Sequence, residues 1–165
     1  MGTGQTLLTI AAMMMISRMV LSVNNQNAQS GGSIEMAAYR ITATSLGTSV
    51  IEEASGLAFD ELSDSNGIST PSSFTAVNKL GPDNGEVYPN YDDFDDFNGL
   101  HKIDSLVGSA VFATDVTVQY VSITSNVITV ANTQTYNKQI TVKVSSKWMS
   151  DTLKFYNVMS YWFFR

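Results

Sequence analysis

The 165-residue sequence contains no cysteine, only three prolines and a single histidine. Without cysteine the chain has no disulfide, no thiolate metal ligand and no cysteine nucleophile. Charged residues make up 15% of the chain and the net charge is -6, so the clustered Lys and Arg that nucleic acid selects are missing and we expect no nucleic-acid partner. The sequence also lacks a nucleophile elbow, a phosphate-binding loop and a zinc-protease motif, and His101 beside Lys102 is typical of a surface residue. We therefore expect a protein that is not an enzyme and requires no cofactor.

Charge is almost absent from the opening stretch "LLTIAAMMMISRMVLSV", where Arg18 is the only charged residue between Leu7 and Val23. No Lys or Arg precedes Arg18, so the positively charged start of a secretory signal is missing and we expect the segment to be retained. A membrane helix needs about 20 apolar residues, which makes this span marginal. Arg18 at bilayer depth would cost about 2.5 to 3.5 kcal/mol. A helix that is apolar on every side must be surrounded on every side, and a domain of this size rarely encloses one.

The amide-rich stretch "NNQNAQSGGS" follows at residues 24–33 and contains Gly31 and Gly32. Glycine weakens a helix by about 1 kcal/mol relative to alanine, so we predict a break or hinge here. From Ile34 to Leu62 apolar residues recur at helical intervals, which predicts an amphipathic helix with Ser33 as its N-cap. These patterns divide the chain into an apolar helix and hinge over residues 1–32 and a globular head over residues 33–165.

The rest of the head is predicted to be a long polar loop followed by a sheet. Residues 63–100 contain Gly, Pro, Asn, Asp and Ser throughout and are too punctuated for regular elements. Runs rich in β-branched and aromatic residues then predict strands over residues 111–124, 126–131, 139–147 and 153–164. We expect these strands to form an antiparallel meander with the amphipathic helix across one face. The predicted fold class is α+β.

This order of elements resembles the type IV pilin superfamily, which includes the pseudopilins of type II secretion. Three stretches carry the resemblance, namely "GQTLLTIAAMMMIS", "DDFDDFNGL" and "KQITVKVSSKWMSDTLKFYNVMSYW". The resemblance implies that the apolar half-helix holds the subunit in the inner membrane before assembly and packs in the core of a filament afterwards. The family usually has Glu as its fifth mature residue. Gln5 stands at that position if Met1 is the mature start, and Thr9 does if the chain is cut after Gly4. Gln keeps the shape and a hydrogen-bonding oxygen without the charge.

We therefore predict a structural subunit of an extracellular helical filament on the cell surface, whose partner is a further copy of itself. Subunits related by a rotation that does not close form such an open polymer, and flexible methionine side chains adapt to the gaps between neighbours. The residues predicted to form the filament core are Gln5, Leu7, Leu8, Ile10, Met13, Met14, Ile16, Arg18, Met19, Val20 and Leu21. Two alternatives stay open. One is a membrane-tethered exported β-domain that acts as an adhesin or receptor module, and the other is a minor pseudopilin of a type II secretion system.

Carboxylates crowd the loop before the predicted sheet, and no basic residue lies between Lys79 and His101. Calcium takes six to eight oxygen ligands from Asp, Asn and backbone carbonyls, and a bound ion would hold a long loop in place. The candidate calcium ligands are Asp92, Asp93, Asp95, Asp96 and Asn98. The alternative is a solvated acidic turn without a metal, because the spacing does not match an EF-hand.

Overall fold

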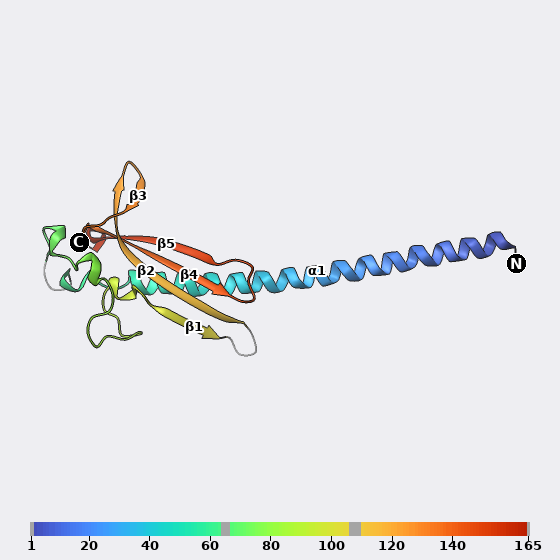
Figure 1. The fold of residues 1–165 in the computed structure, drawn as a ribbon, viewed down its shortest axis with the longest axis horizontal. Coiled ribbons are helices and arrows are strands. Elements are labelled where there is room, and N and C mark those ends of the chain that lie inside the picture. The colour runs from blue at the N-terminus through green and yellow to red at the C-terminus, as the bar shows by residue number, and fades with distance from the viewer. Residues whose placement is uncertain (1, 64–66, 106–109, 165) are drawn as a thin grey trace. The chain divides into compact units, whose positions relative to one another are not determined.

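The computed structural model describes residues 2–63, 67–105 and 110–164. Its contacts divide the chain into two compact units, Met1–Tyr39 and Arg40–Arg165, and each is described separately below. The predicted α+β class is confirmed, because a long N-terminal helix is followed by an antiparallel sheet of five strands, and the later part of that helix packs on the sheet (Figure 1).

Helix α1 runs without interruption over Thr3–Ser55, so the predicted hinge at residues 24–33 is wrong. Ser33 does not cap a second helix, because its hydroxyl donates to the Gln29 carbonyl oxygen at 3.0 Å, as a mid-helix serine does. The penalty for Gly31 and Gly32 is about 1 kcal/mol each, and a helix already formed on both sides continues through them because propagation is far less costly than nucleation.

The head begins with the last four turns of α1, which pack on the sheet. The helix face that is buried there consists of small side chains at intervals of four, three and four residues, namely Ala43, Gly47, Val50 and Ala54. The amphipathic pattern was predicted to continue to Leu62, but the helix ends at Ser55 and Gly56 closes it with hydrogen bonds to the carbonyls of Glu52 and Glu53. Apolar residues after Ser55 therefore belong to the following loop.

The sheet contains β1 (His101–Ser105), β2 (Val111–Thr124), β3 (Val127–Val130), β4 (Asn137–Ser146) and β5 (Leu153–Ser160). The predicted strand over residues 111–124 is confirmed, and β1 is a strand that the sequence patterns missed. The strand order is β1-β2-β4-β5, with β3 paired to β2 alone, so the predicted meander is wrong at β3. The cause is the length of β2, since Phe112–Tyr120 pairs with β4 and only its last four residues pair with β3.

Alternation along the central strands places their apolar side chains in the core. Val116, Val118 and Tyr120 of β2 are buried, as are the alternate β4 residues from Ile140 to Val144. The helix approaches closely, because a Cβ added at Gly47 would lie 2.4 Å from the ring of Phe155. Only glycine fits at that point of contact without a shift of the ring.

The segment between α1 and β1 has no α-helix and no strand among its described residues, as predicted. Its regular structure is limited to single turns of 3-10 helix, namely η1 (Glu61–Ser63), η2 (Pro71–Ser73), η3 (Val77–Lys79) and η4 (Asp95–Phe97). A further turn, η5 (Tyr161–Phe164), ends the strand that was predicted to continue to residue 164. An isolated parallel bridge between Ala58 and Asp93 holds the acidic part of the loop beside the end of the helix.

Candidate functional site

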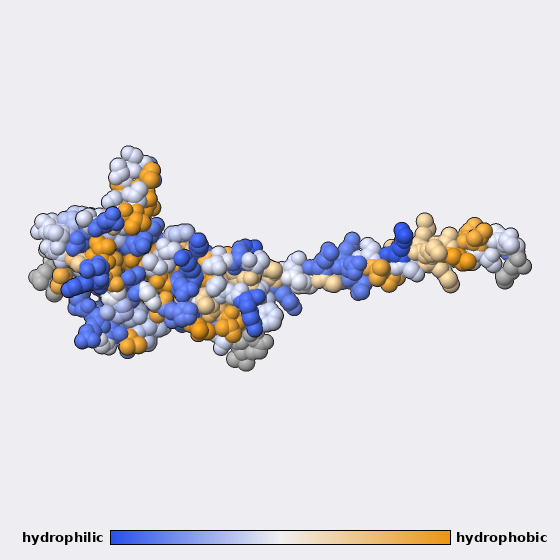
Figure 2. Space-filling view, viewed as in Figure 1, coloured by the Kyte–Doolittle hydropathy of each residue, from blue (hydrophilic) through white to orange (hydrophobic). Residues whose placement is uncertain are grey.

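The assembly segment, defined here as Leu7–Val23 of α1, exposes its large apolar side chains on all sides of the helix. Leu8 is 73% exposed and Met15 is 77% exposed. Figure 2 shows apolar residues gathered along this N-terminal stretch and hydrophilic residues farther along the helix. All of the predicted filament-core residues lie on this helix and are exposed, namely Gln5, Leu7, Leu8, Ile10, Met13, Met14, Ile16, Arg18, Met19, Val20 and Leu21. By length and composition, α1 is also apolar enough to cross a membrane.

Two hydroxyl groups of the assembly segment, those of Thr9 and Ser17, are hydrogen-bonded within the helix itself. Thr9 donates to the Thr6 carbonyl at 2.8 Å, and Ser17 donates to the Met13 carbonyl at 2.8 Å. Hydroxyls bonded in this way carry no unsatisfied donor into apolar surroundings. Arg18 is the one charged side chain of the segment, and within the described part of the chain it has no ion pair. Arg18 is therefore the one charge that burial of the segment would remove from water.

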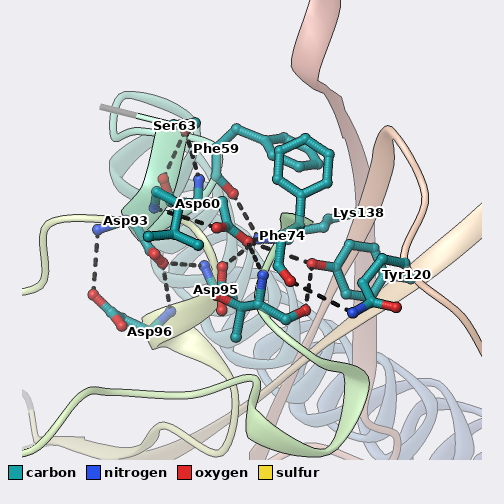
Figure 3. A network of polar contacts seen from close by, with 12 residues as sticks. Phe59, Asp60, Ser63, Phe74, Asp93, Asp95, Asp96, Tyr120 and Lys138 are labelled. Atoms are coloured by element: carbon teal, nitrogen blue, oxygen red, sulfur yellow. Dashed lines mark hydrogen bonds and ion pairs between the residues drawn. The ribbon is translucent and has the colours of Figure 1, made fainter. Parts of the chain in front are cut away.

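In the head, the acidic loop is organised around Lys138, which lies on the buried face of β4. Its amino group is fully buried and donates to the Phe59 carbonyl at 2.7 Å and to Asp60 Oδ2 at 2.9 Å. It also pairs with Asp95 Oδ1, so two carboxylates meet one ammonium group (Figure 3). Lys138 thereby joins the end of α1, the η4 turn and the sheet.

Asp60, one of the two carboxylates that face Lys138, accepts hydrogen bonds from backbone amides on both of its oxygens. One of its oxygens accepts a hydrogen bond from the Thr75 amide at 2.9 Å, and the other accepts one from the Leu62 amide at 3.3 Å. The Tyr120 hydroxyl lies 3.4 Å from Asp60 Oδ2, and burial beside these carboxylates strongly raises the pKa of Tyr120. These hydrogen bonds hold Asp60 in place beside the amino group of Lys138.

Asp93 and Asp96 hold the turn around η4 through backbone hydrogen bonds. Asp93 Oδ1 accepts from the amides of Asp95 and Asp96 at 2.7 and 3.2 Å, and Asp96 Oδ2 accepts from the amides of Asp92 and Asp93 at 3.2 Å. Burial raises the pKa of Asp93 and of Asp96 to about 7 in each case, and the neighbouring carboxylates add to the effect. Near neutral pH, this turn therefore carries less negative charge than its sequence suggests.

The structure does not bring the five candidate calcium ligands to one point. Asp95 turns to Lys138, and Asn98 donates to the Leu80 carbonyl at 2.9 Å and accepts from the Val118 amide at 2.9 Å. Asp92 and Asp96 do lie together with Glu86, and one oxygen from each of the three carboxylates falls within 4.8 Å of the others. This trio is the arrangement in the described loop that could hold a divalent cation.

Lys138 and Asp60 are the site residues that the sequence patterns missed. The sequence did contain a sign of Lys138. It lies two residues before Ile140, in the same every-second-residue pattern as Val142 and Val144, which places it on the buried face of β4. A lysine at such a position requires a buried acidic partner.

Searches against protein-family models, curated proteins and solved structures find no matching family, relative or structure.

Proposed function

We propose that this protein is a structural subunit of an extracellular helical filament, which polymerises through the assembly segment. The observation that carries the proposal is the exposure of large apolar side chains on every side of that segment. Burial of apolar surface contributes about 25 cal/mol per Å², so contact with neighbouring helices would stabilise such a segment strongly. The partner is a second copy of the chain, and the resemblance to type IV pilins supports the same arrangement.

Lipid alone suits the segment less well than protein does. At 1.5 Å per residue the apolar stretch rises about 25 Å, which is less than the ~30 Å thickness of the hydrocarbon region. Arg18 also lies within the stretch, and a guanidinium group is more easily paired inside a protein assembly than in lipid. We therefore place the segment in the inner membrane before assembly and in the filament core afterwards.

The amide-rich helical turns at residues 24–33 support packing between copies. These residues are all exposed, and Asn, Ser and Gly are poor helix formers. Helices in proteins take most of their stability from packing, so a neighbouring subunit would stabilise this part of α1. A lipid bilayer would not, because the stretch is too polar to enter it.

The second candidate is a membrane-tethered domain that works as an adhesin or receptor module, and it is favoured by the hydropathy of α1, which suits a membrane span. The two functions differ in what surrounds the assembly segment. Material sheared from cells that express the full chain should contain regular fibres by negative-stain microscopy. Particles found only in the membrane fraction would contradict the filament and support the tether.

A pair of matched substitutions sharpens this experiment. Met15→Glu places a charge within the assembly segment and should abolish the fibres, because a carboxylate buried among apolar helices has no partner. Thr117→Glu adds the same charge at an exposed position of β2 and should leave the fibre yield unchanged. Fibres of normal yield from Met15→Glu would show that assembly does not depend on this segment.

A further inference from the structure

The contact between Lys138 and Asp95 places an amine directly against a carboxyl group in the core of the head. The lysine side chain is 0% exposed and the aspartate side chain is 3% exposed, so the two groups meet away from bulk water. A second carboxylate, that of Asp60, lies 2.9 Å from the same amino group. Figure 3 shows the side chains of Asp60 and Asp95 converging on Lys138 from the loop.

We infer that Lys138 and Asp95 condense to form an intramolecular amide bond, with Asp60 accepting the proton that the lysine ammonium must lose. The bond forms inside the head of one chain. The inference therefore does not rest on the proposed filament.

Two aromatic rings shield the amino group of Lys138 from water. The amino group lies 4.6 Å from the ring centre of Phe59 and 5.3 Å from that of Tyr120. Two aromatic rings on a buried ammonium exclude water, and the desolvation penalty of a buried ion pair is several kcal/mol for each ion. Condensation replaces the ammonium and the carboxylate by one neutral amide, which removes both penalties.

Asp95, rather than Asp60, is suited to be the carboxyl group that reacts. Both oxygens of Asp60 accept hydrogen bonds from backbone amides, those of Leu62 and Thr75, which hold this carboxyl group in place beside the amino group as the proton acceptor. Burial raises the pKa of Asp95, although the nearby ammonium opposes the shift. The neutral acid form that burial favours has an electrophilic carbon, Cγ.

The step balances without an oxidant, a reductant or a co-reactant. The Lys138 ammonium gives one proton to Asp60, and the lone pair of the free amine attacks Cγ of protonated Asp95. The Nζ–Cγ bond forms and a Cγ–Oδ bond breaks, and the departing hydroxyl takes a second proton from Nζ and leaves as water. Nζ keeps one hydrogen as the amide N–H, and Asp60 afterwards releases its proton to solvent.

A cavity beside Asp95 can take up the water molecule that the condensation releases. A cavity of about 310 Å³ is lined by Asp93, Asp95 and Asp96 together with residues of the η1 and η3 turns. The released water can enter this polar cavity directly from the reacting carboxyl group.

Mass spectrometry of the full chain tests the inference. The protein is purified in detergent, its folded state is confirmed by tryptophan fluorescence, and its mass is then measured after denaturation. The expected mass is that of the sequence less one water molecule. The unmodified sequence mass in a folded sample would overturn the inference.

Trypsin digestion identifies the two partners, because cleavage follows Lys and Arg. Asp60 falls in the peptide of residues 41–79, Asp95 falls in residues 80–102, and Lys138 falls in residues 103–143 once its own cleavage is blocked. We expect residues 80–102 joined to residues 103–143. A link from residues 41–79 to residues 103–143 would overturn the assignment of Asp95.

Three variants separate the roles of the residues. Asp95→Ala removes the reacting carboxyl and should keep the full sequence mass, as should Asp60→Asn, which removes only the proton acceptor. Lys102→Met breaks the part-exposed pair of Lys102 with Asp104 and should still lose one water. Loss of water from Asp60→Asn at the wild-type rate would overturn the role of Asp60, and loss of water from Asp95→Ala would overturn the bond itself.

Discussion

The two parts of helix α1 have the same backbone and opposite surroundings. From Arg40 to Ser55, one face is covered by the sheet, and the buried residues there are small. From Thr3 to Val23 every residue is exposed, and the large apolar side chains there are those of leucine, isoleucine, methionine and valine. One part of the helix therefore packs within the chain, and the other leaves its apolar side chains exposed.

The difference lies in the size and variety of the side chains. Ala43, Gly47 and Ala54 let a sheet lie close against one defined face of the helix. Long flexible side chains around the whole circumference of the assembly segment define no single face, and they suit several neighbours at once. The first pattern is typical of a packed core, and the second is typical of a helix within a bundle of copies or in lipid.

The largest expected effect comes from placing a charge at a buried position and, for comparison, at an exposed position of helix α1. Val50 is 4% exposed and Ile41 is 72% exposed on the same helix. Val50→Asp should lower the free energy of unfolding of the head by about 3 to 5 kcal/mol, because it buries an unpaired carboxylate and removes packing. Ile41→Asp should change it by less than about 0.5 kcal/mol. Urea unfolding followed by tryptophan fluorescence reports the head alone, since Trp148 and Trp162 both belong to it; equal effects of the two substitutions would contradict the packing described.

The second expected effect is a pH dependence confined to the head. The pKa values of Asp93 and Asp96 are about 7 in the folded state, above the ordinary aspartate value of 3.8, so the folded head binds protons more tightly than the unfolded chain. That contribution to stability is present at low pH and is lost as pH rises through about 7. We expect the free energy of unfolding to fall by about 2 to 4 kcal/mol between pH 5 and pH 8.

A double variant provides the control for this dependence. Asp93→Asn combined with Asp96→Asn should flatten the pH profile of the fluorescence transition. The charged residues of the N-terminal unit are Arg18 and Glu35 alone, so helicity of that unit in detergent micelles should not follow the same profile. A head whose stability rises from pH 5 to pH 8 would contradict the assigned direction of both pKa shifts.

The smallest expected effect contrasts two glycines of the same helix. Gly47→Ala places a methyl group against the Phe155 ring and should destabilise the head by about 1 to 3 kcal/mol. Gly31→Ala meets no atom within 4 Å and should strengthen the helix by up to about 1 kcal/mol. Thermal melts of the head and the far-ultraviolet circular dichroism of the full chain measure the two effects, and a stabilising Gly47→Ala would show that Phe155 yields easily.

Alternation of polar and apolar residues predicted the central strand β2 but not the edge strand β1. Alternation in "VFATDVTVQYVSIT" located β2 because its polar and apolar residues face different surroundings. The same rule missed β1. Its residues "HKIDS" are mostly polar, and β1 has a neighbouring strand, β2, on one side only. An edge strand of that kind is held by its neighbour, and its own side chains give little sign of it.

The candidate sites were predictable to different degrees. The assembly segment was identified from its composition, because an apolar run with one charge is a local property. The organisation of the acidic loop was not, since Asp60 and Asp95 meet Lys138 across sequence separations of 78 and 43 residues. The predicted hinge was wrong because the prediction considered only the helix propensity of Gly31 and Gly32. It did not include the cooperativity of the helix on both sides of them.

The position of Lys138 near the end of the chain sets the order in which the protein can be completed during synthesis. The backbone of helix α1 makes only local hydrogen bonds and leaves the ribosome first, whereas Asp60 and Asp95 of the loop precede the lysine that they contact by 78 and 43 residues. The buried cluster around Lys138 can therefore form only on a nearly finished polypeptide, after helix α1 and the loop have been translated.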